Sequence, residues 1–444
     1  MMNPLRVLAT ELARRGVPDV WFATDEYRRP DIEGISGTNP VEFASLGETI
    51  PERSAETWDE RTYRAVTQAN LFKAHQAQIE QGYDPSLQAA KYRALESAAD
   101  KIQPALMVID SMCQYGIDLA ITKGIPYVLS TTFLPSVWLT SYFPFGKSYT
   151  SPWFPVPNSG LPRDMTIGQQ LANQLFRLRT MATFGKPKML KVLAREHRGR
   201  RELGIAPEAR RFLAKADRAE LILCYSVPEL EYPFRYPDTL LTVGAMLPPL
   251  PEAADDGGHL TAWLDRQDSV VYMGLGTVTR LSPPEIRSMV EVARRLEGRH
   301  SVLWKLPLEQ QEFLPPAATL PGNLRIETWL PSQHDVLAHP KVTVFFTHGG
   351  GNGFHESLRH GKPMVIRPLW ADGPDQAVRG QERGVSLTLD RPHDLVPDDV
   401  TDKLTRVLRD GSFRTRAEYF RDLMRAAGGR CTAADRLLGL PALA

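Results

Sequence analysis

The chain has 444 residues, of which 42% are hydrophobic and 24% charged, and its net charge is +1. This length accommodates two domains with separate cores. The near-neutral charge argues against nucleic acid, which binds to concentrated positive charge. The three cysteines are too widely spaced for a disulfide framework or metal cluster. No apolar run approaches the roughly 18 residues of a membrane span, and no signal peptide is visible. We therefore expect a cytoplasmic protein without a transmembrane anchor, either a monomer or a weak dimer.

The first predicted element is a helix close to the start of the chain. Asn3 is expected at its N-cap and Pro4 at its first helical position, and Gly16 lies just past its end. A strand is predicted over residues 20–24. An α/β domain normally begins with a strand that leads into such a helix, whereas here none precedes it.

Helices and strands continue to alternate through the first half of the chain. Residues 62–96 are helical and polar, and residues 105–109 form a strand that leads into Asp110. A helix over 118–123 ends at Gly124, and another strand follows over 125–130. An acid at the end of a buried strand either caps the next helix or has a function. The pattern alone leaves both interpretations open.

Aromatic residues gather between positions 127 and 154, where prolines and glycines interrupt them. The nine are Tyr127, Phe133, Trp138, Tyr142, Phe143, Phe145, Tyr149, Trp153 and Phe154. They indicate either ordinary core packing or, as a group, the wall of a large apolar pocket. Residues 166–203 are helical and strongly basic in their second half, which we interpret as a solvated face.

A linker by composition separates two domains. The run from Met246 to Pro251 is rich in proline, and two aspartates and two glycines follow at 255–258. We predict an N-terminal domain over 1–248, a linker over 249–259 and a C-terminal domain over 260–444. Strands are predicted in the second domain at 270–274, 301–305 and 323–327. The predicted fold is two doubly wound α/β domains that face a cleft.

The stretch from Trp329 to Gln376 has the clearest pattern. A buried strand over 342–347 leads into His348 and four glycines, and a helix over 352–360 follows. A second strand over 364–368 leads to Asp372. Strand, glycine turn and helix together place unpaired N–H groups where a phosphate binds. The glycines let the backbone approach an anion closely. This is the outline of a nucleotide-diphosphate site.

The same stretch resembles the donor-binding signature of UDP-sugar-dependent glycosyltransferases with the GT-B fold. The matching residues are Trp329, Pro331, His339, Thr347, His348, Gly350, Asn352, Glu356, Gly361, Pro363, Pro368 and Asp372. The pattern is closer to the animal, fungal and related bacterial members than to the plant form. There are two departures: one extra residue separates Trp329 from His339, and Gly373 stands where Gln commonly follows the sugar-binding acid.

The resemblance implies a role for each of these side chains. Trp329 would stack on uracil, Glu356 would accept hydrogen bonds from the ribose hydroxyls, and Asp372 would accept them from the sugar. The other expected donor-binding residues are Gly276, Thr277, Leu330, His348, Gly350, Gly351, Asn352 and Gly353. Taken singly, each has an ordinary structural explanation, such as a surface Trp or an exposed helix acid. Their joint order and spacing favour the site.

The catalytic base that the resemblance implies has no counterpart in the chain. In the family, a Gly-His-x-Asn-Pro turn precedes the first helix and its His is the base. Met1 falls on that His, and Asp110 matches its acidic partner. The true start is therefore expected upstream.

The reaction implied by the resemblance is an inverting transfer without a metal or other cofactor. A hexose, expected to be glucose, would pass from a UDP-sugar co-substrate to a hydroxyl of an apolar small molecule or lipid. The alternatives are a catalytically impaired nucleotide-sugar-binding protein and an epimerase acting on the UDP-sugar.

Overall fold

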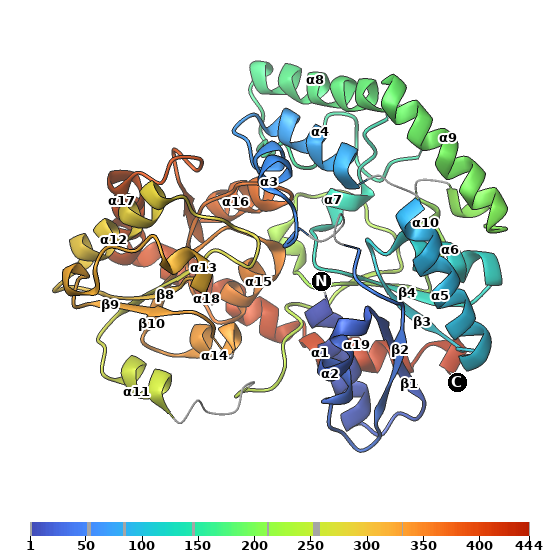
Figure 1. The fold of residues 1–444 in the computed structure, drawn as a ribbon, viewed down its shortest axis with the longest axis horizontal. Coiled ribbons are helices and arrows are strands. Elements are labelled where there is room, and N and C mark those ends of the chain that lie inside the picture. Colours follow the sequence, from blue (N-terminus) through green and yellow to red (C-terminus); the bar gives the residue numbers. More distant parts are fainter. Residues whose placement is uncertain are drawn as a thin grey trace.

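The computed structural model describes residues 2–50, 55–82, 86–143, 147–210, 213–251, 258–330 and 332–443. Two α/β bodies lie side by side, one formed by the first half of the chain and the other mainly by the second half (Figure 1). All paired strands are parallel. Parallel pairing requires crossover connections, which the intervening helices and loops provide.

The N-terminal body has two separate sheets, β1-β2 and β3-β4-β5-β6. In the described part of the chain, β1 and β3 are therefore both edge strands. The strands are β1 (Val20–Thr24), β2 (Val41–Ser45), β3 (Met107–Asp110), β4 (Tyr127–Thr131), β5 (Leu221–Cys224) and β6 (Leu240–Thr242). The helices of this half are α1 (Met2–Arg14), α2 (Arg29–Glu33), α3 (Glu60–Val66), α4 (Leu71–Gly82), α5 (Ser86–Ile102), α6 (Gln114–Lys123), α7 (Pro135–Leu139), α8 (Ile167–Phe184), α9 (Pro187–Glu202) and α10 (Ala214–Asp217).

The C-terminal body has one six-stranded sheet in the order β12-β11-β10-β7-β8-β9. Its strands are β7 (Val270–Gly274), β8 (Ser301–Lys305), β9 (Leu324–Glu327), β10 (Val342–Thr347), β11 (Met364–Ile366) and β12 (Ser386–Thr388). The helices of the second half of the chain are α11 (His259–Asp265), α12 (Pro283–Leu296), α13 (Leu308–Gln311), α14 (Gln333–Ala338), α15 (Gly351–Arg359), α16 (Gly373–Glu382), α17 (Pro397–Arg409), α18 (Gly411–Ala426) and α19 (Gly429–Leu438). The strand order is that of a doubly wound dinucleotide-binding sheet.

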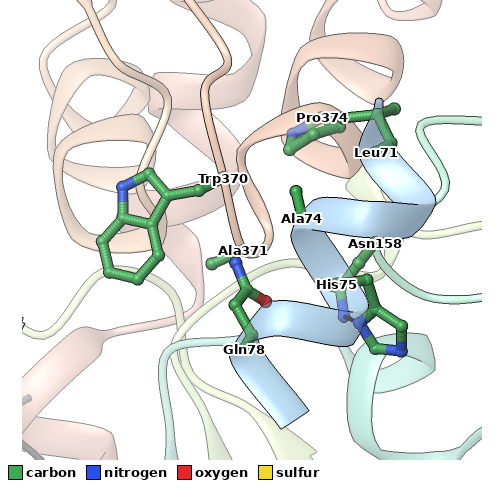
Figure 2. A pocket seen from close by; sticks show the side chains of 8 residues that line it. All are labelled: Leu71, Ala74, His75, Gln78, Asn158, Trp370, Ala371 and Pro374. Atoms are coloured by element: carbon green, nitrogen blue, oxygen red, sulfur yellow. Dashed lines mark hydrogen bonds between the residues drawn. The ribbon is translucent and has the colours of Figure 1, made fainter. Parts of the chain in front are cut away.

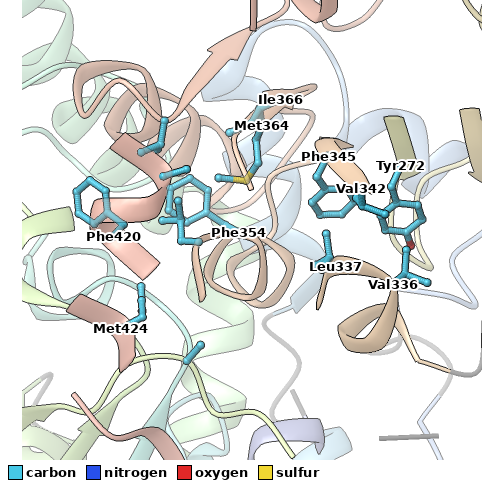
Figure 3. Packing of buried hydrophobic residues seen from close by; sticks show 14 of the residues in the cluster. Tyr272, Val336, Leu337, Val342, Phe345, Phe354, Met364, Ile366, Phe420 and Met424 are labelled. Carbon is cyan, nitrogen blue, oxygen red and sulfur yellow. The ribbon is translucent and has the colours of Figure 1, made fainter. Parts of the chain in front are cut away.

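Helices cover both faces of this sheet, so its central strands are buried on both sides. Tyr272 and Phe345 stack on one face with ring centroids 4.9 Å apart, and Figure 3 shows them in the same packed layer as Leu337. Met273 packs in a second cluster on the opposite face. The first cluster also includes Leu134 of the N-terminal body. The apolar core is thus continuous between the two bodies.

Sequence predictions of strands in the second domain agree closely with the structure, whereas helix ends differ. The strand over 20–24 is also confirmed. The N-cap prediction for Asn3 is wrong, because α1 begins at Met2 and contains Asn3. The polar helical region over 62–96 is three helices, α3, α4 and α5.

The last helix returns to the first body. Ala433, Ala434 and Leu437 of α19 share a buried cluster with Leu8 and Leu12 of α1, and α19 lies beside α1 in Figure 1. The sequence pattern did not indicate this return, which ties the end of the chain to the body formed by its beginning.

Candidate functional site

The candidate site lies at the point where the chain changes direction across the six-stranded sheet. β7 and β10 are neighbours there, although β8 and β9 lie between them in the sequence. Ligands of doubly wound sheets bind beyond the carboxyl ends of the strands at such a point. β7 leads into Gly276 and Thr277, and β10 leads into His348. The fold therefore brings together the two turns expected to hold the diphosphate.

His348 lies between these turns. A Cβ atom on Gly276 would be 2.7 Å from His348 Cε1, and one on Gly350 would be 2.5 Å from His348 Nε2. Gly276 also has a φ of +78°, which a residue with a Cβ rarely adopts. The two glycines thus leave the space that the imidazole ring occupies.

The imidazole of His348 is held neutral. Desolvation disfavours its charged form and lowers the pKa of His348 to about 4. Nδ1 is buried and has no hydrogen-bond partner in the described ranges. A buried polar atom without a partner costs stability, so this nitrogen is placed to hydrogen-bond a ligand or an ordered water.

The N-terminus of α15 faces the same turns. Gly350 is its N-cap residue, and Phe354 and Leu358 anchor the helix in the core. The first N–H groups of a helix have no partner within the helix. The Asp372 carboxylate lies close to the backbone of Gly351, since a Cβ on Gly351 would be 3.2 Å from Asp372 Oδ2. The N–H groups of Asn352 and Gly353 are therefore available to an anion. The positive end of the helix dipole adds to this attraction.

Trp329 lies on the surface beside the site, with 64% of its area exposed. The Lys305 ammonium lies 4.1 Å from the centre of its ring, a cation–π contact that steadies an otherwise exposed side chain. Leu330, by contrast, is buried in the core cluster shared with Tyr272. Pro331 lies outside the described residues.

Glu356 is held by a residue that the sequence analysis missed. Gln333 Nε2 donates to Glu356 Oε2 at 2.6 Å, and the Tyr272 hydroxyl donates to Gln333 Oε1 at 3.1 Å. This chain fixes the carboxylate where ribose hydroxyls are expected. Gln333 lies in the interval from Trp329 to His339, which holds one residue more than the family pattern.

Asp372 is a buried acid at the start of α16. Burial raises its pKa to about 6, and the charge of Asp375 adds to the rise. Asp372 Oδ2 and both amide atoms of Gln376 are buried without a hydrogen-bond partner in the part of the chain described here. Ala371, just before Asp372, has a φ of +54°, a strained value for a residue with a Cβ. Gln376 was not predicted, although its amide lies one helical turn from the acid.

The N-terminal body contacts the glycine turn directly. A Cβ on Gly351 would lie 2.9 Å from the Thr132 carbonyl oxygen. His355 Nε2 lies 3.0 Å from Ser226 Oγ. Thr132 follows β4 and Ser226 follows β5, so the carboxyl ends of strands from both bodies meet at the candidate site.

A buried ion pair joins the two bodies behind Asp372. The Arg379 guanidinium on α16 donates to Glu231 Oε1 at 2.9 Å and 3.1 Å and to Ser136 Oγ at 2.9 Å. Asp375 accepts from the backbone N–H groups of Asn158 and of residue 160 at 2.7 Å and 3.0 Å. The helix that begins next to Asp372 is therefore fixed against the N-terminal body.

Asp110 is the last residue of β3, at the open edge of its sheet. Its Oδ1 accepts from the Met112 N–H at 2.8 Å, and burial raises its pKa. The alternative that it caps the next helix is wrong, because Cys113 occupies the N-cap of α6. The position of Met1, its expected counterpart, lies outside the described residues.

A small hollow adjoins the loop before Asp372. It is lined by Leu71, Ala74, His75, Gln78, Asn158, Trp370, Ala371 and Pro374. Figure 2 shows Ala371 and Pro374 on one side and α4 on the other. None of the eight described aromatic residues between 127 and 154 belongs to this lining, and the ninth, Phe145, lies outside the described residues. Tyr127, Trp138 and Phe154 are instead buried in the core, as ordinary packing predicts.

The described ranges hold no group of three His, Cys, Asp or Glu side chains placed to bind a metal ion. Within them, no helix combines the length and apolar character that a membrane crossing needs.

The fold defines a protein of the GT-B class. Solved structures with this fold cover 98% of this chain, and the match covers 94% of each of their own chains. They include the glycotransferase of kitacinnamycin (TM-score 0.67, 20% identity), the calicheamicin glycosyltransferase CalG4 (0.64, 20%) and UDP-glucose: anthocyanidin 3-O-glucosyltransferase in complex with UDP (0.61, 19%).

The family model described as "UDP-glucoronosyl and UDP-glucosyl transferase" matches residues 38–423, and the chain belongs to this family. Human (Homo sapiens) UDP-glucuronosyltransferase 2B7 is 28% identical over 303 residues, which are 67% of this chain and 53% of that protein. UDP-glucuronosyltransferase 2B14 of Oryctolagus cuniculus is 27% identical over 70% of this chain and 55% of its own length. The matches span about half the length of these curated relatives.

Proposed function

We propose that the protein transfers a hexose, glucose in the first instance, from a UDP-sugar to a hydroxyl of an apolar small molecule or lipid. The observation that carries the proposal is the meeting of unpartnered buried polar atoms at one helix N-terminus. His348 Nδ1, Asp372 Oδ2 and the Gln376 amide lack partners within the described residues. They lie on the two segments that flank the N-terminus of α15. A nucleotide sugar supplies a diphosphate for the helix and hydroxyls for the acid and the amide.

In the proposed reaction the acceptor oxygen forms a bond to the anomeric carbon while the bond from that carbon to the diphosphate breaks. UDP leaves with the electron pair from the opposite face, so the configuration inverts. The negative charge that develops on the diphosphate is stabilised by the N–H groups of Asn352 and Gly353. The anchored helix already fixes the orientation of these groups. Neutral His348 adds a hydrogen-bond donor and Thr277 a hydroxyl. Donors that need not reorient stabilise the transition state most.

The proton of the acceptor hydroxyl passes to a base. From the resemblance we propose a His at the position of Met1, with Asp110 as its acidic partner. The open edges of β1 and β3 support a further strand between the two sheets. A chain extended by a strand ending in Gly-His before Met2 should turn over faster by ~10²–10⁴-fold, the usual contribution of a general base. Equal rates for the two chains would remove this base from the mechanism.

Product analysis tests the proposal. A panel of UDP-sugars is incubated with flavonoid, sterol and macrolide acceptors, and the products are analysed by mass spectrometry. We expect an acceptor with the mass of one hexose added and one UDP released per product. UDP binding without turnover by the extended chain would instead identify a nucleotide-sugar-binding protein. Consumption of UDP-sugar without acceptor would identify an epimerase. We propose a metal-free reaction in the cytoplasm, so EDTA should leave the rate unchanged.

A further inference from the structure

Helix α8 packs with its polar side inward. Asn173, Arg177 and Thr180 are at most 6% exposed, although they are polar residues on a surface helix. The opposite side carries Leu171 and Leu178, which are 67% and 59% exposed. A surface helix ordinarily buries its apolar stripe, whereas the buried residues of α8 are polar except for Phe176.

Hydrogen bonds fix this orientation. Asn173 accepts from the Val156 N–H at 2.8 Å and donates to the Phe154 carbonyl at 3.0 Å. Arg177 donates to the Ser141 and Phe154 carbonyls at 2.5 Å and 2.9 Å. Turning the helix to bury its leucines would leave these backbone groups without partners, at a cost for each. The exposure of the leucines is therefore fixed by the hydrogen bonds that orient the helix.

The exposed aliphatic residues form one stripe. Ile167, Leu171, Leu175 and Leu178 are 44–79% exposed. At 100° per residue their positions fall within an arc of about 80°, along a helix of 18 residues and thus about 27 Å. A continuous apolar stripe on an outer helix marks an interaction surface.

The next helix carries a basic stripe. Lys188, Lys191, Arg195 and Arg198 of α9 are exposed, and their positions fall within about 80° of arc, which also contains the exposed Glu202. Residues 166–203 contain nine Lys and Arg and two Glu, an excess of seven positive charges. The whole chain carries only +1, so the other residues together carry −6. The two helices follow one another along one rim of the molecule (Figure 1).

We propose that α8 and α9 form a docking surface for the anionic face of a lipid bilayer. Lying in the plane of the interface, α8 would insert its aliphatic stripe at the boundary between headgroups and acyl chains, while the cations of α9 pair with lipid phosphates. A second copy of the chain is the weaker candidate, because like-charged α9 helices would repel each other at a shared interface. The basic residues of α9 other than Arg200 are exposed, as the sequence interpretation of a solvated face expects. If the proposed function holds, this surface would give the protein access to acceptors dissolved in the bilayer.

Vesicle flotation tests the proposal with the full chain. Vesicles of phosphatidylcholine alone are compared with vesicles that contain about 30% phosphatidylglycerol, near ~0.1 M and ~0.5 M salt. We expect binding to the anionic vesicles that falls with salt. The double variants Leu171→Gln/Leu178→Gln and Lys191→Gln/Arg195→Gln should each lower the partition coefficient about tenfold or more. Because these side chains are exposed, the melting temperature of each variant should stay close to that of the parent.

Matched controls come from the C-terminal body. Leu308 is 65% exposed, and the Arg414 side chain is 74% exposed, so Leu308→Gln and Arg414→Gln change surface character away from α8 and α9. Both should bind vesicles like the parent. Absence of binding to anionic vesicles, or equal losses in controls and α8 variants, would overturn the proposal. Sedimentation velocity adds a further outcome: a dimer that dissociates in Leu171→Gln/Leu178→Gln, without vesicle binding by the parent, would make this face a contact between copies.

Discussion

Removing the Arg379 guanidinium should destabilise the protein strongly, because its partner acid is buried. In the Arg379–Glu231 pair the side chains are 3% and 1% exposed, so neither charge regains water when the other is lost. Breaking a buried pair in this way costs about 3–5 kcal/mol. We expect Arg379→Met to lose that much free energy of unfolding. Arg379→Met/Glu231→Gln should lose clearly less than the two single variants combined, because it leaves no unpaired charge.

Urea denaturation at pH 7 measures these differences. The matched control is Arg414→Met, which breaks the surface pair with Glu418, and it should lose about 0–1 kcal/mol. The same variants should also change sugar-donor kinetics, because α16 begins beside Asp372. Loosening α16 should raise the KM for UDP-sugar more than the Kd for UDP. An Arg379→Met protein as stable as the Arg414→Met control would refute the argument that the pair is desolvated and joins the two bodies.

Three further predictions concern the donor site. Trp329→Ala should weaken UDP binding about tenfold in calorimetry, since a stacked base is worth roughly 1–3 kcal/mol; unchanged affinity would remove Trp329 from the site. His348→Ala should lower kcat more than it raises KM, because its hydrogen bond counts most as UDP departs; a change confined to KM would contradict that role. Asp372, whose pKa is raised to about 6, should make UDP-sugar affinity rise with pH between about 5 and 7 as the carboxylate forms. The ligand-free protein should lose stability as pH rises from about 4 to 6, because the folded state holds that proton longer than the unfolded state. Asp372→Asn should flatten both profiles.

The strands of the second domain were predictable because both faces of the sheet are covered. Buried parallel strands are continuous apolar runs, and residues 270–274, 301–305 and 342–347 form strands with the predicted bounds. The glycine turn was predictable for a related reason. Close approach of the backbone to an imidazole or a ligand requires residues without a Cβ, and such residues are visible in a sequence.

Side-chain contacts between distant segments were not predictable. Gln333 meets Glu356 from another helix, and Arg379 meets Glu231 from the other body. The orientation of α8 depends on Asn173 and Arg177 reaching carbonyl groups of a loop that no periodic pattern reveals. In each case the partner lies elsewhere in the chain, and only the folded backbone brings it near. The apolar spacing in α8 indicates a helix correctly but not which side of it is buried.

The electrostatics of the donor site depend on its glycines more than on charged side chains. Gly276 and Gly350 leave room for the His348 ring, and burial there keeps that ring neutral at pH 7. In the proposed reaction, His348 would therefore offer the leaving diphosphate one hydrogen bond and no full positive charge. Further stabilisation would come from the Thr277 hydroxyl and from N–H groups at the start of α15, which neither titrate nor reorient. Fixed dipoles of this kind suit a reaction in which charge appears on the ligand only in the transition state. A Cβ on either glycine would displace the ring, and with it a side-chain donor that those dipoles complement.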